Sequence, residues 1–180
     1  MSVNTESHLP CIVVAGVSGT GKTTLARLLA DRLGVPFAEA DDFHPPASIA
    51  KMSAGIRLDD ADRQPWLESL GRWLHERDTT GSGGVITCSA LKRSYRNTLR
   101  AACQDVFFLH LTAGHDLLAD RIGKRTGHFM PRSLLDSQLA ALEPLAPDEP
   151  GATLDAALAP ETLADTAMHL LPRPHGEDPE

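Results

Sequence analysis

The chain alternates short apolar runs with longer segments in which apolar residues recur at helical spacing. Leu25, Leu28, Leu29 and Leu33, for example, fall on one face of a helix. Short strands between amphipathic helices are typical of βαβ units, and therefore of a parallel sheet covered by helices in three layers. The predicted strands span residues 11–15, 35–38, 85–88, 106–111 and 152–156. The predicted helices span residues 23–33, 65–77, 92–102, 116–124, 131–142 and 160–171.

Length and composition indicate one α/β domain. The chain has 180 residues, of which 42% are hydrophobic and 23% charged, as in globular proteins that bury their own core. The stretches 79–84 and 144–151 are rich in Gly or Pro and are predicted loops. We predict a single domain over residues 1–172 and a flexible tail over residues 173–180. In the helix over 65–77, Pro65 is expected in the first turn, with Asp62 as the N-cap.

The net charge limits what this protein binds. It carries 17 Lys and Arg against 24 Asp and Glu, a formal charge of −7. General nucleic-acid binding depends on many cations that neutralise phosphates, so no nucleic-acid partner is expected. Any small anion that the protein binds must meet a local cluster of positive charge.

Cysteine spacing and hydropathy indicate a cytoplasmic protein without a membrane partner. Cys11, Cys88 and Cys103 are widely spaced, and this pattern favours buried reduced thiols over a disulfide framework or a zinc site. The apolar run 11–15 is too short to cross a bilayer, and the polar segment before it lacks the basic start of a signal peptide.

A phosphate-binding motif lies between the first strand and the first helix. Residues 16–23, GVSGTGKT, match the pattern GxxxxGK[ST] of the P-loop. Glycines let backbone N–H groups approach phosphate oxygens, Lys22 adds a charge for the terminal phosphates, and the Thr23 hydroxyl can bind Mg²⁺. The motif predicts ATP and Mg²⁺ as cofactors. The predicted nucleotide contacts are Gly16, Ser18, Gly19, Thr20, Gly21, Lys22, Thr23 and Thr24.

Carboxylates follow the second predicted strand rather than the third or fourth. Glu39, Asp41 and Asp42 lie where a parallel sheet binds ligands, beside the P-loop. There they could orient an acceptor hydroxyl and help to hold hydrated Mg²⁺, and helix capping or turn formation is the structural alternative. No Asn/Thr-Lys-x-Asp pattern is present, which disfavours a GTPase.

Several further motifs resemble those of one enzyme family. They are DDFHP at 41–45, the pattern IxKMxxGxxLxDxDRxPWL at 49–67, CSALKxxYR at 88–96 and GHFMP at 127–131, followed by LLxSQ at 134–138 and LE at 142–143. From about residue 12 to 155 the chain is similar to small gluconokinases. The resemblance implies a fold like that of shikimate and nucleoside monophosphate kinases, with a five-stranded parallel sheet, a substrate-binding helical segment after strand two and a mobile lid. It also implies transfer of phosphate from ATP to the 6-hydroxyl of D-gluconate with Mg²⁺, and a homodimer.

Gluconate is an anion with many hydroxyl groups, so its pocket needs cations together with hydrogen-bonding groups. We predict that Asp41 accepts the proton of the acceptor hydroxyl and that Ser89 binds hydroxyl groups. For Arg63 the alternative is a surface ion pair with Asp60 or Asp62, and for Lys51 and Arg57 it is simple exposure. The predicted cationic contacts are His44, Lys51, Arg57, Arg63, Lys92 and Arg96.

A second cationic segment, 121–132, forms the predicted lid. Here Arg125 is expected to meet the transferring phosphate, Arg121 to flank adenine and His128 to contact substrate. Gly123 and Gly127 would act as hinges. The structural alternative is a helix end that gathers cations against its dipole.

Lys22, Asp41 and Arg125 are therefore the predicted catalytic residues, and Thr23 is the predicted metal ligand. Two other functions share the P-loop. One is a kinase for shikimate or another small hydroxy acid, and the other is an ATPase or regulator without an acceptor.

Overall fold

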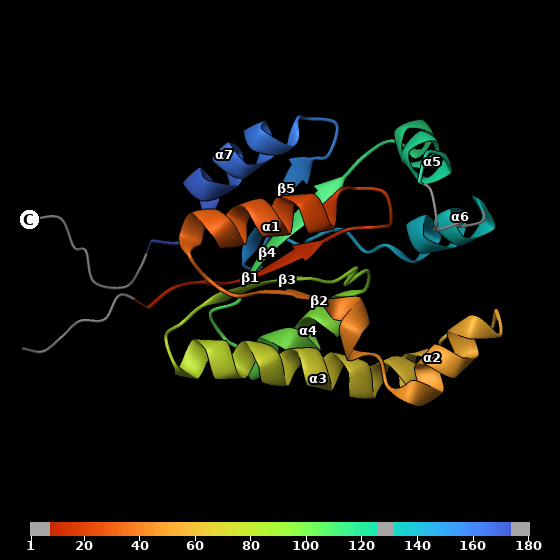
Figure 1. Ribbon diagram of the computed structural model, residues 1–180, viewed down its shortest axis with the longest axis horizontal. Helices are drawn as coiled ribbons and strands as arrows, with labels where there is room; N and C mark the ends of the chain where they lie inside the picture. The colour runs from red at the N-terminus through yellow and green to blue at the C-terminus, as the bar shows by residue number, and fades with distance from the viewer. Residues whose placement is uncertain (1–7, 126–131, 174–180) are drawn as a thin grey trace, which may run out of the picture.

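A computed structural model describes residues 8–125 and 132–173, and its centre is a five-stranded parallel sheet in the order β2-β3-β1-β4-β5 (Figure 1). β1 pairs with β3 and β4 on either side, and Val13 lies opposite Ile86 and Phe108. The predicted fold class is confirmed, and each strand lies within one or two residues of its predicted position. The strands are β1 (Cys11–Ala15), β2 (Phe37–Glu39), β3 (Gly84–Thr87), β4 (Phe107–Thr112) and β5 (Gly151–Asp155).

Helices cover both faces of the sheet. Ile12 and Val14 pack with helices α1 (Lys22–Leu33) and α7 (Pro160–Leu170). Val13 and Ala15, which point the opposite way, pack with α3 (Asp60–Thr79) and α4 (Arg93–Ala102). Because both faces are buried, the central strand is a continuous apolar run instead of an alternating one.

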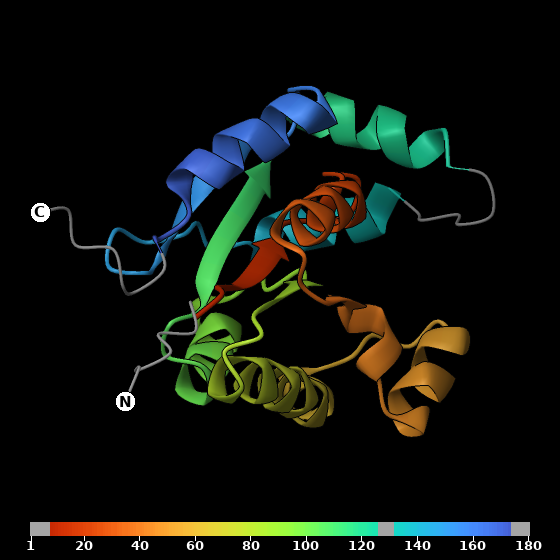
Figure 2. The same cartoon turned by 60° about the vertical axis from the view of Figure 1, so that its left-hand side comes forward.

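The remaining helices lie at the end of the sheet toward which the strands point. α5 (His115–Gly123) and α6 (Arg132–Ala141) lie on one side of that end, and α2 (Pro46–Ser53) lies on the other (Figures 1 and 2). α2 fulfils the helical segment after strand two that the family resemblance implies. It is preceded by a 3-10 helix, η1 (Ala40–Phe43), which follows β2 directly.

Helix α3 begins well before its predicted start at residue 65. α3 starts at Asp60, and its N-cap is Asp59, whose carboxylate accepts from the Asp62 N–H at 2.7 Å. The Asp62 carboxylate in turn accepts from the Asp59 N–H at 3.0 Å, which completes a capping box. Asp62 is therefore the third helical residue and not the N-cap, and Pro65 lies inside the helix at the loss of one backbone hydrogen bond.

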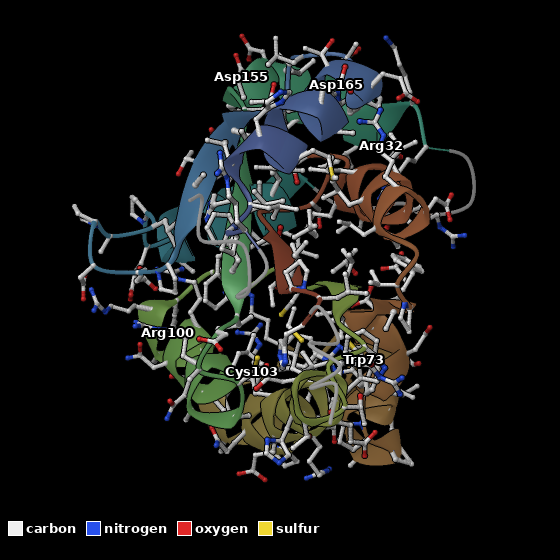
Figure 3. All side chains as sticks on the ribbon, turned by 90° about the vertical axis from the view of Figure 1, so that its left-hand side faces the viewer. Arg32, Trp73, Arg100, Cys103, Asp155 and Asp165 are labelled. Atoms are coloured by element: carbon white, nitrogen blue, oxygen red, sulfur yellow. The ribbon has the colours of Figure 1, made fainter. Side chains whose placement is uncertain are left out.

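Polar side chains join the outer helices α1 and α7. Arg32 of α1 donates to Asp165 of α7 at 2.6 Å, and Figure 3 shows the two side by side.

All three cysteines are buried, as predicted, and none is in a disulfide. The sulfur atoms of Cys11 and Cys103 and a carboxylate oxygen of Asp78 lie within 4.8 Å of one another. A hydrogen bond with Cys103 and burial raise the pKa of Cys11, so this thiol stays protonated. Within the described residues, no helix is long and apolar enough to cross a membrane.

Candidate active site

The loop between β1 and α1 has the conformation that phosphate binding requires. Gly16, Gly19 and Gly21 have φ angles of 142°, 87° and 86°, values that residues other than glycine rarely adopt. A Cβ atom on Gly16 would lie 2.6 Å from the carbonyl oxygen of Leu111, so only glycine fits there. The backbone N–H groups of such a loop, together with the N-terminus of α1, attract anions.

A cavity of about 170 Å³, here called the phosphate pocket, opens in front of this loop. It brings the predicted catalytic residues Lys22, Asp41 and Arg125 together with the predicted metal ligand Thr23. These residues come from three different segments, so their convergence is a result of the fold. The other lining residues are Ser18, Gly19, Gly21, Glu39, Ala40, Thr87, Cys88, Ser89 and Gln138.

Lys22 lies on the floor of the phosphate pocket. Its Nζ donates to the carbonyl of Val17 at 3.1 Å. Desolvation lowers the pKa of Lys22 to about 8, and the nearby Asp41 carboxylate opposes that shift. A partly desolvated ammonium group interacts more strongly with an anion than an exposed one does, so Lys22 is suited to binding phosphate.

The carboxylates after β2 take different positions. Asp41 in η1 exposes 93% of its side chain at the phosphate pocket, with its carboxylate 3.9 Å from His44 Nε2. Glu39 also lines the pocket and accepts from the Thr87 hydroxyl at 2.5 Å. Two of the three predicted carboxylates therefore reach the pocket, while Asp42 does not line it.

A second cavity, of about 280 Å³, adjoins the first and shares Gly19, Gly21 and Arg125 with it. We call it the base pocket. Arg121 lines it and donates to the carbonyl oxygens of Gly19 at 3.4 Å and Ala156 at 2.8 Å. The predicted nucleotide contacts Thr20 and Thr24 line it too, although the Thr20 hydroxyl donates internally to Val17. Its remaining walls are Leu25, Ala156, Leu158, Pro160 and Leu163.

A third cavity, of about 400 Å³, lies on the other side of the phosphate pocket and is called the acceptor pocket. It shares Ser89 and Gln138 with the phosphate pocket. Four predicted substrate contacts line it: Arg57, Arg63, Ser89 and Lys92. The other lining residues are Leu58, Asp59, Asp60, Trp66, Leu91, Tyr95, Leu134, Ser137 and Ala141.

The cations of the acceptor pocket differ in their partners. Lys92 pairs with Asp60 at 3.1 Å, whereas Arg63 donates to the neutral Tyr95 hydroxyl at 2.9 Å. Arg57 donates to the Ser137 hydroxyl. Within the described part of the chain neither arginine forms an ion pair, so both guanidinium groups are available to an anion.

Three predicted substrate contacts do not line the cleft. Arg96 is fully buried and pairs with Glu149, so its predicted contact with substrate is replaced by a structural role. Lys51 pairs with Asp62 at 2.6 Å, outside the acceptor pocket. His44 stacks on Trp66 with ring centroids 4.7 Å apart, and burial lowers the pKa of His44. A fourth, His128, lies outside the described residues, as does most of the predicted lid after Arg125.

Sequence reasoning missed two residues that shape the site. Tyr95 donates to Asp60 and accepts from Arg63. The hydrogen bonds that Tyr95 and Lys92 donate to Asp60 lower the pKa of this carboxyl group. Gln138 accepts from the Ser18 N–H of the P-loop at 2.9 Å across 120 residues of sequence. Both Tyr95 and Gln138 fall within motifs of the family resemblance, which was the only signal for them.

A P-loop at the carboxyl end of a parallel sheet, with a further pocket on each side of the phosphate site, defines a P-loop kinase of small molecules. Residues 11–145 match the family model described as an AAA domain. The gluconokinase of Gluconobacter oxydans (strain 621H) is 56% identical over 139 residues, which cover 77% of this chain and 78% of that protein. The chain belongs to the gluconokinase family.

Solved structures agree. The unliganded crystal structure of a sugar kinase from Janibacter sp. HTCC2649 is 52% identical, with a TM-score of 0.85 over 91% of this chain and 94% of that one. A gluconokinase from Sinorhizobium meliloti 1021 is 41% identical, with a TM-score of 0.81 over 92% and 93% of the two chains.

Proposed function

We propose that this protein is a gluconokinase that transfers the γ-phosphate of ATP to the 6-hydroxyl of D-gluconate. The observation that carries the proposal is the row of three adjoining pockets. The middle one holds the P-loop, Lys22 and Asp41, and one neighbour offers two arginines that have no carboxylate partner among the residues the structure describes. In a chain of charge −7, that neighbour is suited to an organic acid.

ATP would extend from the base pocket into the phosphate pocket. Adenine would lie near Arg121 and the segment 156–160, and the phosphates would meet the P-loop N–H groups, Lys22 and Arg125. The Thr23 hydroxyl is suited to bind Mg²⁺ directly, with Glu39 and Asp41 close enough to hold its water ligands. Bound Mg²⁺ neutralises charge on the phosphates.

Gluconate would lie in the acceptor pocket. Its carboxylate would pair with Arg63 and Arg57, and its hydroxyl groups would bond to Ser89, Asp60 and Lys92. This orientation directs the far end of the sugar acid, which carries the 6-hydroxyl, toward Ser89 and the phosphate pocket.

In the reaction the 6-hydroxyl oxygen forms a bond to the γ-phosphorus while the bond from that phosphorus to the β,γ-bridging oxygen breaks. ADP leaves with the bridging oxygen, and the hydroxyl proton goes to Asp41. The exposed carboxylate of Asp41 is suited to accept this proton, and Lys22 and Arg125 stabilise the charge on the transferring group.

Support for a homodimer comes from the family resemblance, and support for a cytoplasmic location comes from the spacing of the cysteines and the hydropathy of the sequence. We include both in the proposal. The function itself is tested by following ADP formation with gluconate, glucose, shikimate and other hydroxy acids, and without an acceptor. We expect rapid turnover with gluconate alone. Faster turnover with shikimate would favour a shikimate kinase. A rate of ATP hydrolysis that is the same with and without each acid would favour an ATPase or regulator.

A further inference from the structure

Gln138 of α6 joins two parts of the site. Its Oε1 accepts from the Ser18 N–H of the P-loop at 2.9 Å. Its side chain also lines the phosphate pocket and the acceptor pocket, a position that only Ser89 shares among the described residues. Gln138 therefore lies where the terminal phosphate and the acceptor must meet.

Helix α6 is fastened to both pockets around this residue. Leu135 is buried against Val17 of the P-loop and Ile122 of α5. One residue before Gln138, the Ser137 hydroxyl accepts from Arg57 of the acceptor pocket. A change in the contact of Gln138 at the P-loop is therefore transmitted to a helix that also forms a wall of the acceptor pocket.

The bond between Ser18 and Gln138 competes with a phosphate. Backbone N–H groups of a P-loop bind phosphate oxygens, and a bond to an anionic oxygen is roughly twice as strong as one to a neutral amide. A γ-phosphate that takes the Ser18 N–H would release the amide of Gln138. The released amide has two N–H donors and one acceptor, which can bond to the γ-phosphate and to a hydroxyl of the sugar acid.

We propose that Gln138 is a positioning residue that couples the nucleotide and acceptor pockets, so that ATP bound in one increases the affinity for gluconate in the other. The inference rests on the proposed function, because it takes gluconate as the acceptor. Coupling of this kind is reciprocal, so gluconate increases the affinity for ATP by the same factor. ADP has no γ-phosphate and produces less coupling.

The test is a thermodynamic cycle by isothermal titration calorimetry. The Kd for gluconate is measured alone, with Mg²⁺ and the β,γ-imido analogue of ATP, and with Mg²⁺-ADP. We expect the analogue to lower the Kd by at least about 5-fold and ADP to lower it less. In Gln138→Leu, which keeps the size but not the hydrogen bonds, the analogue should have little effect. The matched control is Ser133→Ala on the exposed side of α6, which should behave like the wild type.

Two further variants keep the inference open to test if Gln138→Leu does not fold. Gln138→Asn is too short to reach both groups and should lose the coupling. Gln138→Glu keeps the bond to Ser18 but repels a γ-phosphate, so it should weaken binding of the ATP analogue more than binding of ADP. Equal coupling in wild type and the Leu or Asn variant overturns the inference while the gluconokinase activity stands. Failure of the wild type to phosphorylate gluconate overturns the proposed function instead.

Discussion

The side chains of Arg96 and Glu149 form two hydrogen bonds, of 2.7 and 3.0 Å, and neither side chain is exposed to solvent. The Arg96 guanidinium also donates to the carbonyl oxygens of Ala90 at 2.9 Å and Glu143 at 3.1 Å. Ala90 has a φ of 41°, the only positive φ outside glycine among the described residues, and it follows Ser89 directly. The ion pair therefore fixes the loop that carries Ser89 into the cleft.

Replacement of Arg96 by Met should lower the stability of the folded protein, because it leaves the Glu149 carboxylate buried without its partner. We expect a loss of about 3–5 kcal/mol in the free energy of unfolding, measured by urea denaturation. The matched control is Arg93→Met, which breaks an exposed pair with Asp148 and should cost far less. The double variant Arg96→Met/Glu149→Leu should recover much of the loss. Similar costs for the Arg96 and Arg93 single variants would contradict a role for the buried pair in stability.

His110 should make the protein less stable in mild acid. It lies in β4 with 1% of its surface exposed, and burial lowers the pKa of His110 from 6.5 to about 4. The positive charges of Arg96 and Lys22 also lower this pKa, and the negative charge of Glu149 opposes the shift. Between these values the unfolded chain binds a proton that the folded protein does not, so stability falls as pH drops from about 6.5 to about 4. The loss is at most about 3 kcal/mol.

The variant His110→Leu should remove that part of the pH dependence, measured as urea unfolding at several pH values. The control His169→Gln changes an exposed histidine on α7 and should leave the dependence unchanged. A wild-type stability that stays constant over this pH interval would show that His110 is not buried in its neutral form.

Arg63→Met should weaken gluconate binding specifically. Arg63 lines the acceptor pocket without an ion-pair partner among the described residues, so its loss leaves the carboxylate of gluconate with one guanidinium fewer. We expect the KM for gluconate to rise by about 10- to 150-fold, with the KM for ATP little changed. Arg72→Met, on the exposed side of the same helix, is the control. An unchanged KM for gluconate would assign the carboxylate to Arg57 or Lys92.

Asp41→Asn keeps the shape of the side chain and removes the base. General-base variants lose about 10²- to 10⁴-fold in kcat, and a loose transition state for phosphoryl transfer puts the expected loss at the low end. Asp42→Asn, next to it but outside the phosphate pocket, is the control. ATP affinity should persist because Lys22 and the P-loop are unchanged. If Asp41→Asn keeps more than about half of the wild-type kcat, Asp41 only positions the acceptor and Glu39 becomes the candidate base.

Features encoded in consecutive residues could be predicted from the sequence. The P-loop depends on glycines at fixed spacing, and the central strands are apolar on both faces, so both were found close to their observed positions. The bounds of α2 gave no such signal, because Ile49 and Met52 are 51% and 43% exposed and do not mark a face that packs on the core.

Contacts between distant residues could not be predicted. The sequence predicts Arg96 as a substrate contact because it is a cation in a family motif. Its partner Glu149 lies 53 residues further along the chain, in a loop whose path only the fold determines. Lys51 likewise finds Asp62. A charge pattern shows which cations are available, and tertiary structure decides which of them are already paired.

The acceptor pocket is expected to select a sugar acid by its carboxylate. The most direct measurement compares kcat/KM for gluconate and for glucose at saturating Mg²⁺-ATP. Glucose has the hydroxyl groups but no carboxylate, so it would leave Arg57 and Arg63 without an anionic partner in the pocket. We predict a kcat/KM at least about 100-fold higher for gluconate. Equal values for the two sugars would contradict selection by the carboxylate.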